Sequence, residues 1–397
     1  MDKSNTTSKN TALVLSGGGA RAAYQVGALQ AIAEMMPDHC GSPFPIICGT
    51  SAGALNATSL AMHAACFQEG VNALREVWAG FHSAQVYRTD WPGVLGGAFR
   101  WLCNLAFGWF NRGTPVSLLD NSPLRHLLSE AIDLSRLPAA IQAGHLRALC
   151  ITACSYTRGD SVSFFQGASD LDNWSRARRR GVRCDLSIEH LMASSSIPML
   201  FPAVKLDQEY YGDGALRQLA PISPALHLGA DKILVIGSGM QSPEPKRFKR
   251  SGYPSLAEII GHIMSSSFTD SLEMDIERLH RINNTVKQLP AEATTSLRPV
   301  DYLVLSPELA SIEELASQYA SSLPPSIRSF VRGSGVTKRG GSNVLSYLLF
   351  ETDYTQALMA LGYRETRARE VELREFLRPA DAPPSNVYNL RRDSQRN

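Results

Sequence analysis

Short apolar runs alternate with helix-like segments along most of this chain of 397 residues. Six runs have the length and composition of buried strands: residues 12–15, 45–48, 146–151, 161–165, 232–236 and 302–305. After the first run, Val26, Leu29, Ile32 and Met36 recur at the spacing of an amphipathic helix. Because helices separate most of the strands, the pattern predicts an α/β fold with a mainly parallel sheet.

The pattern becomes wholly helical after about residue 310, ending with a run around residues 354–377. Residues 379–397 are polar and contain proline, a composition typical of disorder. No linker rich in proline, glycine or serine divides the first 310 residues. We therefore predict one α/β domain over residues 11–310, a helical segment over 311–378 packed on it, and a disordered tail over 379–397.

A sharp turn is predicted where the second apolar run meets the next helix. The residues there are Gly49-Thr50-Ser51-Ala52-Gly53, the Gly-x-Ser-x-Gly pattern between a strand and a helix. Such a turn strains the serine backbone and lifts its hydroxyl above the sheet edge, and glycines remove the Cβ atoms that would clash there. Ser51 is therefore a candidate nucleophile, with Gly49 and Gly53 as residues of its elbow. The alternative is an ordinary loop rich in glycine and serine.

A second glycine-rich turn follows the first strand. Ser16-Gly17-Gly18-Gly19 leads into a helix, and free N–H groups at a helix N-terminus bind negative charge. The spacing Gly17-x-Gly19-x-x-Ala22 also matches a dinucleotide fingerprint, which needs an acidic residue at the end of the next strand. That strand ends in Gly49-Thr50-Ser51, so we favour an oxyanion hole over a nucleotide site.

A carboxylate that could serve as the base follows an aromatic run. Tyr210-Tyr211-Gly212-Asp213-Gly214-Ala215 contains an Asp-Gly pair, which alone is typical of an ordinary turn. A Ser-His-Asp triad would also need an imidazole, and the candidates in the chain order of α/β-hydrolases are His227, His262 and His280. All three fall in helix-like segments rather than at strand ends. The sequence thus offers a nucleophile and a carboxylate without an evident histidine.

Four blocks of the chain resemble, in order and spacing, the signature motifs of the patatin-like phospholipases of the bacterial type. They are Gly17-Gly18-Gly19-Ala20-Arg21, Gly49-Thr50-Ser51-Ala52-Gly53, Ala193-Ser194-Ser195-Ser196-Ile197-Pro198-Met199-Leu200-Phe201-Pro202 and Asp213-Gly214-Ala215. Ala22 and Ala215 stand where the family usually has glycine. The resemblance covers roughly residues 11–240, and the ordered combination is far more specific than any one block.

The resemblance implies a three-layer α/β/α sandwich with a helical C-terminal extension, in which residues 11–310 are the catalytic domain. It implies a lipid acyl hydrolase of the phospholipase A or lysophospholipase type that works through an acyl-enzyme. Ser51 would be the nucleophile and Asp213 the base. The oxyanion region would consist of Gly17, Gly18 and Gly19 with Arg21. A small-ester or thioester hydrolase with the same dyad, and a non-catalytic lipid-binding regulator, remain open.

The composition indicates which partners and which cellular compartment to expect. Seven cysteines without a Cys-x-x-Cys pair predict neither a disulfide framework nor a zinc site, and we expect no metal and no cofactor. The net charge of +2 implies no nucleic-acid partner. The first ten residues lack an apolar signal core, so we expect a cytoplasmic enzyme, peripheral when it meets its lipid substrate. The oligomeric state stays open.

Two local basic runs depart from this balance. They lie at residues 176–183 and 246–250. Such runs are typical of solvated loops, and near an enzyme mouth they attract anionic headgroups.

Residues 91–110 form an unusual apolar stretch with three of the five tryptophans, Trp91, Trp101 and Trp109. The length suits a membrane span, but Arg100, Asn104 and the glycines disfavour one. A lid or interfacial segment, with these tryptophans in contact with lipid, is the favoured interpretation. A buried core helix is the alternative.

Overall fold

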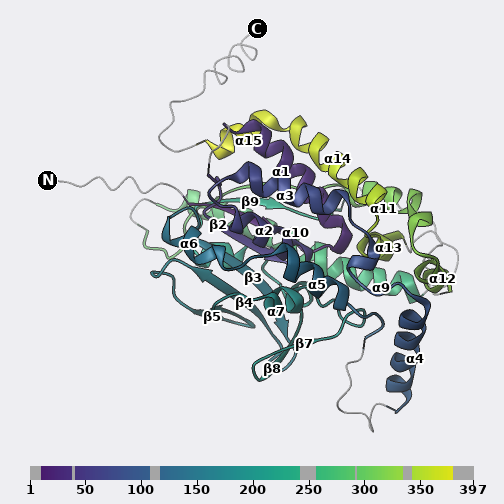
Figure 1. Cartoon of the computed structure of the whole chain (residues 1–397). Coiled ribbons are helices and arrows are strands. Elements are labelled where there is room, and N and C mark those ends of the chain that lie inside the picture. Colours follow the sequence, from purple (N-terminus) through teal and green to yellow (C-terminus); the bar gives the residue numbers. More distant parts are fainter. Residues whose placement is uncertain are drawn as a thin grey trace.

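The computed structural model describes residues 10–37, 41–107, 117–241, 256–290, 293–333 and 342–378. These residues form a ten-stranded sheet with helices on both faces (Figure 1). The strand order is β10-β9-β1-β2-β3-β4-β6-β5, and β8 pairs with β3 while β7 pairs with β8. The strands are β1 (Thr11–Leu15), β2 (Ile46–Thr50), β3 (Ala148–Ser155), β4 (Asp160–Gly167), β5 (Trp174–Arg176), β6 (Arg179–Arg183), β7 (Val204–Leu206), β8 (Glu209–Asp213), β9 (Lys232–Ile236) and β10 (Asp301–Leu305).

Helices fill most of the connections. The α-helices are α1 (Ala23–Met35), α2 (Ala52–Met62), α3 (Phe67–Ala79), α4 (Trp91–Phe107), α5 (Ser122–Ala131), α6 (Arg136–Gln142), α7 (Ile188–Ser194), α8 (Ser223–His227), α9 (Leu256–Ser265), α10 (Ser271–Gln288), α11 (Leu309–Gln318), α12 (Pro325–Gly333), α13 (Ser342–Leu348), α14 (Thr352–Ala368) and α15 (Glu370–Leu377). Shorter turns are η1 (Gly19–Ala22), η2 (Ser83–Gln85), η3 (Gly214–Leu216), η5 (Ala320–Ser322) and the π-helical η4 (Ser266–Asp270).

The strands from β10 to β3 are all parallel, whereas β4 and β8 run antiparallel to β3. The register sets Leu15 of β1 opposite Gly49 of β2. Parallel neighbours end at the same edge of a sheet, so the glycine loop after β1 and the turn at Ser51 leave the sheet together. The mainly parallel α/β prediction is confirmed.

Two apolar layers separate the sheet from its helices. On one face, residues of α1, α2, α3 and α14 pack on alternate residues of the strands, such as Leu13 and Ile47. On the other face, α8 and α10 cover the intervening residues, such as Val14 and Cys48. β1, β2, β3 and β9 are therefore buried on both sides, which explains why each appears in the sequence as a continuous apolar run.

The sequence pattern located the central strands but not the sheet edge. All six predicted strands are present, and β9 has the predicted bounds. The interpretation of the basic run at 176–183 as a loop is wrong, because β5 and β6 form a short antiparallel pair there. This pair is only partly buried and its residues are mostly polar, so it has no apolar alternation to reveal it. The basic run at 246–250 lies outside the described residues.

The C-terminal helices are part of the same packed body. α14 lies against α1, and a Cβ atom at Gly27 of α1 would lie only 1.8 Å from the carbonyl oxygen of Met359. A Cβ atom at Gly362 of α14 would lie 2.1 Å from the carbonyl oxygen of Tyr24, so the two helices meet backbone to backbone. The proposed boundary at residue 311 falls inside α11, and residues 379–397 lie outside the described part of the chain.

Candidate active site

Ser51 occupies a sharp turn between β2 and α2, with backbone angles of φ 54° and ψ −131°. Residues with a side chain rarely adopt a positive φ. A Cβ atom at Gly49 would lie 2.4 Å from the carbonyl oxygen of Gly53, and one at Gly53 would lie 2.4 Å from that of Leu15. Both positions therefore require glycine, and the turn holds Ser51 at the carboxyl end of β2.

A buried serine fixes the backbone of this turn. The Ser51 N–H donates to Ser194 Oγ at 2.9 Å, and Ser194 Oγ donates to the carbonyl oxygen of Thr152 at 2.7 Å. Ser194 ends α7 and is fully buried. It thus links the strained turn to β3. The sequence analysis placed Ser194 in the third signature block without assigning it this role.

Asp213 ends β8 and is fully buried. Its Oδ1 accepts a hydrogen bond from the Ala215 N–H at 2.9 Å. Its Oδ2 has no partner at standard hydrogen-bond geometry among the described residues. Burial raises the pKa of Asp213 to about 7, although the nearby Ser51 hydroxyl and the Ala215 N–H favour the charged form. Asp213 is thus a buried carboxyl near the Ser51 hydroxyl, with one oxygen free of other partners among the described residues.

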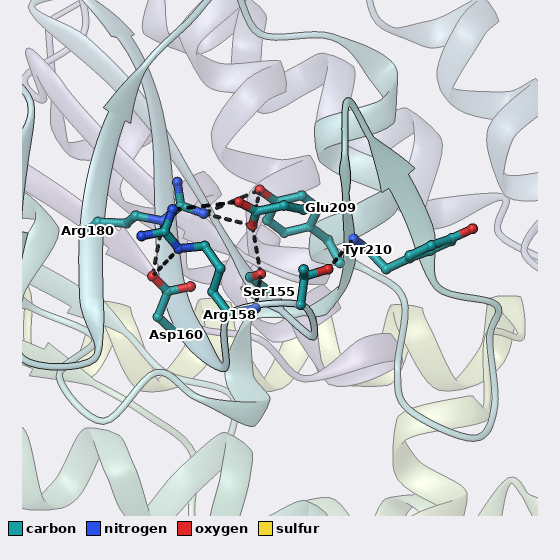
Figure 2. Close-up of polar contacts among 8 residues, drawn as sticks. Ser155, Arg158, Asp160, Arg180, Glu209 and Tyr210 are labelled. Atoms are coloured by element: carbon teal, nitrogen blue, oxygen red, sulfur yellow. Dashed lines mark hydrogen bonds and ion pairs between the residues drawn. The ribbon is translucent and has the colours of Figure 1, made fainter.

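A polar network holds the strand that carries Asp213 (Figure 2). Arg180 of β6 pairs with Asp160 of β4 at 3.0 Å and with Glu209 of β8 at 2.9 Å. Glu209 also accepts a hydrogen bond from Ser155 Oγ of β3 at 2.8 Å. Burial alone would raise the pKa of Glu209, yet the hydrogen bond from Ser155 and the charge of Arg180 hold it below its usual value. The network therefore joins the start of β8 to three neighbouring strands.

The glycine loop lies directly against Ser51. A Cβ atom at Gly17 would lie 3.1 Å from Ser51 Cβ and 2.9 Å from the ring of Phe268. A Cβ atom at Gly18 would lie 2.4 Å from Ser238 Cβ. Among the described residues, the N–H groups of Gly17, Gly18 and Gly19 donate no hydrogen bond. These donors are therefore available to a ligand beside Ser51.

Arg21, which we expected in the oxyanion region, directs its side chain elsewhere. The guanidinium is fully buried and donates to Ser346 Oγ at 2.7 Å, Tyr347 OH at 3.0 Å and Asn343 Oδ1 at 2.7 Å. All three partners belong to α13. The side chain thus fastens the glycine loop to the C-terminal helices.

An apolar cavity of about 30 Å³ touches Ser51. Its walls come from the glycine loop, the Ser51 elbow, helices α2, α3 and α5, the segment before α4, the third signature block and the loop before α14. The lining residues are Gly19, Ser51, Ala52, Leu55, Trp78, Phe81, Val86, Leu124, Ser195, Ile197, Phe201 and Phe350. Ser51 itself is 2% exposed. In this conformation the Ser51 side chain therefore has little contact with solvent.

Comparison with known families decides the identity of this fold and motif set. The family model described as patatin-like phospholipase matches residues 13–226, more than half of the chain. The chain belongs to the patatin-like phospholipases. This family consists of carboxylic ester hydrolases, and the match includes the glycine loop, the Ser51 elbow and Asp213.

Solved structures give a more distant likeness. Human GIVD cytosolic phospholipase A2 is 12% identical at a TM-score of 0.42, with 93% of this chain and 60% of that chain covered. VipD from Legionella pneumophila is 13% identical at a TM-score of 0.29, with 95% of this chain and 92% of that chain covered. The patatin-like chain thus spans three-fifths of the length of the human enzyme. A comparison with curated proteins gives no match.

Two of the three candidate histidines of this patatin-like chain have partners away from the elbow, and the third lies on α9. His227 stacks on Trp174 with ring centroids 5.0 Å apart, and burial lowers its pKa to about 4. His280 Nδ1 lies 3.2 Å from the hydroxyl of Tyr302. His262 lies on α9. None of these rings lines the cavity at Ser51.

The tryptophan-rich stretch forms α4, which projects from the body of the patatin-like fold beside α12 (Figure 1). Trp91, Leu95 and Phe99 are 51%, 60% and 68% exposed and recur every four residues, so they share one face of the helix. Trp101 is half-buried, and Trp109 lies outside the described residues. No helix in the described part of the chain is long and apolar enough to span a membrane.

Proposed function

We propose that the chain is a serine acyl hydrolase that cleaves ester bonds of membrane lipids in the manner of a phospholipase A or lysophospholipase. The observation that carries this proposal is the pairing of a strained serine with a buried carboxyl whose pKa is raised to about 7. A carboxyl with an ordinary pKa near 4 is a weak base, whereas one near 7 suits proton transfer at neutral pH.

The proposed reaction has two steps. Asp213 accepts the hydroxyl proton of Ser51 while Ser51 Oγ attacks the ester carbonyl, and the alcohol part of the lipid leaves with that proton. A water molecule, deprotonated by Asp213, then attacks the acyl-enzyme, releases the fatty acid and restores the Ser51 hydroxyl. Oδ2 of Asp213, the unpartnered oxygen, is the proposed proton acceptor.

The glycine loop is the proposed oxyanion hole. Its free N–H groups lie beside Ser51 and are fixed before substrate binds, so they stabilise the negative charge that develops on the carbonyl oxygen. The loss of one such donor typically costs about 2.7–4 kcal/mol of transition-state stabilisation. Arg21 acts through the loop rather than on the oxyanion, because its guanidinium donors are used by α13.

Two features support a lipid rather than a small soluble ester. The cavity at Ser51 is walled mainly by aliphatic and aromatic side chains, which suit an acyl chain. The exposed stripe of Trp91, Leu95 and Phe99 on α4 suits the interface of a bilayer. The cavity must widen to admit a chain, so the segment before α4 and the loop before α14, which line it, are proposed to move when lipid binds.

Labelling with a fluorophosphonate probe, followed by mapping of the modified residue, tests the proposal. We expect the label on Ser51, lost in Ser51→Ala and strongly slowed in Asp213→Asn. Labelling of another residue would refute the nucleophile. Release of fatty acid from phosphatidylcholine vesicles then tests the substrate class. Rapid cleavage of short esters or thioesters with no vesicle turnover would favour a small-ester hydrolase.

A further inference from the structure

A second cavity lies on the opposite side of the sheet from the one at Ser51. It has a volume of about 200 Å³ and is formed by β4, the β5–β6 hairpin, the segment after Asp213, α8 and α10. Four arginines line it: Arg178, Arg179, Arg217 and Arg278. None of its lining residues is acidic. A concave site with this charge selects for anions.

The two arginines that begin β6 have different environments. Arg180 is neutralised by Asp160 and Glu209, as Figure 2 shows. Arg179, its neighbour, points to the other side of the strand and lines the cavity. Arg179 makes no ion pair with any described residue. The positive charge at this sheet edge is therefore concentrated on the cavity side.

The remaining guanidiniums reinforce this imbalance. The side chains of Arg178 and Arg217 are exposed at the rim and, within the described ranges, form no ion pair or hydrogen bond. Among the described residues, Arg278 alone of the four forms an ion pair with a carboxylate, Asp275 at 3.4 Å. Asp275 has a second partner, because its Oδ2 accepts a hydrogen bond from the Ile222 N–H at 3.0 Å. In the described part of the chain, one carboxylate therefore opposes four guanidiniums.

The floor of the cavity supplies neutral donors. Ser161, Ser163 and Ser223 line it and are buried, and the hydroxyls of Ser161 and Ser223 have no hydrogen-bond partner in the described structure. Trp174 forms a wall and is held rigid between Phe165 and His227, whose rings stack on it at 5.1 and 5.0 Å. Charged donors at the rim and hydroxyls on the floor are the donor set that a phosphate group uses.

We propose that this cavity binds a phosphate group, carried either by a phospholipid headgroup or by a small soluble phosphate ester. Guanidinium forks match phosphate oxygens with two parallel hydrogen bonds each. The site is separate from the Ser51 cavity, so the bound phosphate need not belong to the lipid being cleaved. This binding activity goes beyond the proposed hydrolysis.

The cavity is connected to the proposed dyad through one short segment. Arg217 and Gln218 follow Asp213 by four and five positions. The hydroxyl of Thr50, which precedes Ser51, donates to Gln218 Oε1 at 2.8 Å. Beside them, Leu219 is 66% exposed at the rim. A phosphate held by Arg217 would therefore order the segment that joins the base to the nucleophile turn.

Binding is measured on full-length Ser51→Ala protein, so that no lipid is hydrolysed and the outcome is independent of the proposed activity. The probes are sn-glycerol 3-phosphate, followed by calorimetry, and vesicles of phosphatidylcholine with or without phosphatidic acid, followed by sedimentation. We expect the double variant Arg179→Gln/Arg217→Gln to weaken binding of at least one probe by about tenfold or more, the effect of losing charge-assisted hydrogen bonds. Arg125→Gln, an exposed arginine outside the cavity, should leave binding within about twofold.

The two probes distinguish the two possible carriers of the phosphate group, a soluble ester and a lipid headgroup. Weakened glycerol phosphate binding supports a soluble ligand, and weakened binding of phosphatidic acid vesicles alone supports a headgroup. If the double variant unfolds, Arg217→Lys is used, which keeps the charge but loses the fork and should still bind more weakly than Ser51→Ala alone. Binding of neither probe, or equal binding by the cavity variants and the control, overturns the proposal.

Discussion

The guanidinium of Arg21 lies 3.8 Å from the ring centroid of Tyr347, a residue 326 positions later in the chain. This contact joins the glycine loop at the N-terminus to α13 near the C-terminus. Gly19 adds a close approach in the same place, because a Cβ atom there would lie 2.3 Å from the carbonyl oxygen of Tyr347. The geometry of the proposed oxyanion hole therefore depends on a helix outside the matched family region.

Substitution of Arg21 should disturb both stability and turnover. Arg21→Lys keeps the charge but cannot reach all the acceptors on α13, so buried polar groups lose their partners. We expect the free energy of unfolding to fall by about 2–4 kcal/mol, and kcat to fall with little change in KM. Chemical denaturation and ester hydrolysis measure the two effects.

Arg125→Lys is the matched control, since Arg125 is an exposed arginine paired with Glu189. It should stay within about 0.5 kcal/mol of the parent protein. An Arg21→Lys protein with normal stability but a raised KM would instead indicate that Arg21 contacts substrate.

The raised pKa of Asp213 predicts a pH dependence of activity. A general base must be deprotonated, so kcat/KM should rise with pH through about 7 and level off above it. Below that value the rate should fall about tenfold per pH unit. A short soluble ester assayed from pH 5 to 9 measures the profile. A rate that stays constant down to pH 5 would argue against Asp213 as the base.

The same carboxyl predicts a pH dependence of stability. The pKa of Asp213 is higher in the folded state than the usual 3.8, so between pH 4 and 7 the unfolded chain loses this proton first. The Asp213 contribution to the free energy of unfolding should therefore fall by up to about 4 kcal/mol as pH rises through this window. Asp213→Asn has no carboxyl at this position, so its free energy of unfolding should not show this fall. The stability of the variant relative to the parent protein should therefore be greater at pH 8 than at pH 4. Denaturant unfolding of both proteins at pH 4 and pH 8 measures this difference. The prediction is refuted if the free energy of unfolding changes equally with pH in the two proteins.

The contact between Gly18 and Ser238 predicts a rescue experiment. Gly18→Ala should lower kcat by about 100-fold or more, because its Cβ would overlap Ser238 and displace the loop with its N–H donors. The double variant Gly18→Ala/Ser238→Gly removes the opposing Cβ and should recover part of that loss. Equal rates for the single and double variants would show that this contact does not position the loop.

The apolar stripe on α4 predicts a separation of two activities. Leu95→Ser with Phe99→Ser should weaken vesicle binding by about tenfold or more, since each exposed side chain contributes apolar area to the interface. Hydrolysis of a short soluble ester should remain, because α4 does not line the cavity at Ser51. Val371→Ser on α15, a 69% exposed valine, is the control and should leave vesicle binding unchanged. Equal losses on both substrates with a lower Tm would assign α4 a structural role.

The local sequence determined the central strands and the turns between them. Continuous apolar runs predicted β1, β2 and β9 because a parallel strand is buried on both faces. The glycines at 49 and 53 predicted the strained turn because only glycine fits where backbones meet. These features leave a mark in the local composition, so the pattern is sufficient to identify them.

The tertiary structure decided the features that depend on distant residues. The direction of the Arg21 side chain depends on α13, and the pKa of Asp213 depends on how completely the surrounding elements exclude water. The arginines of β6 illustrate the same limit: the sequence shows a basic run, but only the fold neutralises Arg180 and leaves Arg179 facing a cavity. Burial, charge balance and side-chain direction are set by packing between segments far apart in the chain, and a local pattern carries no information about them.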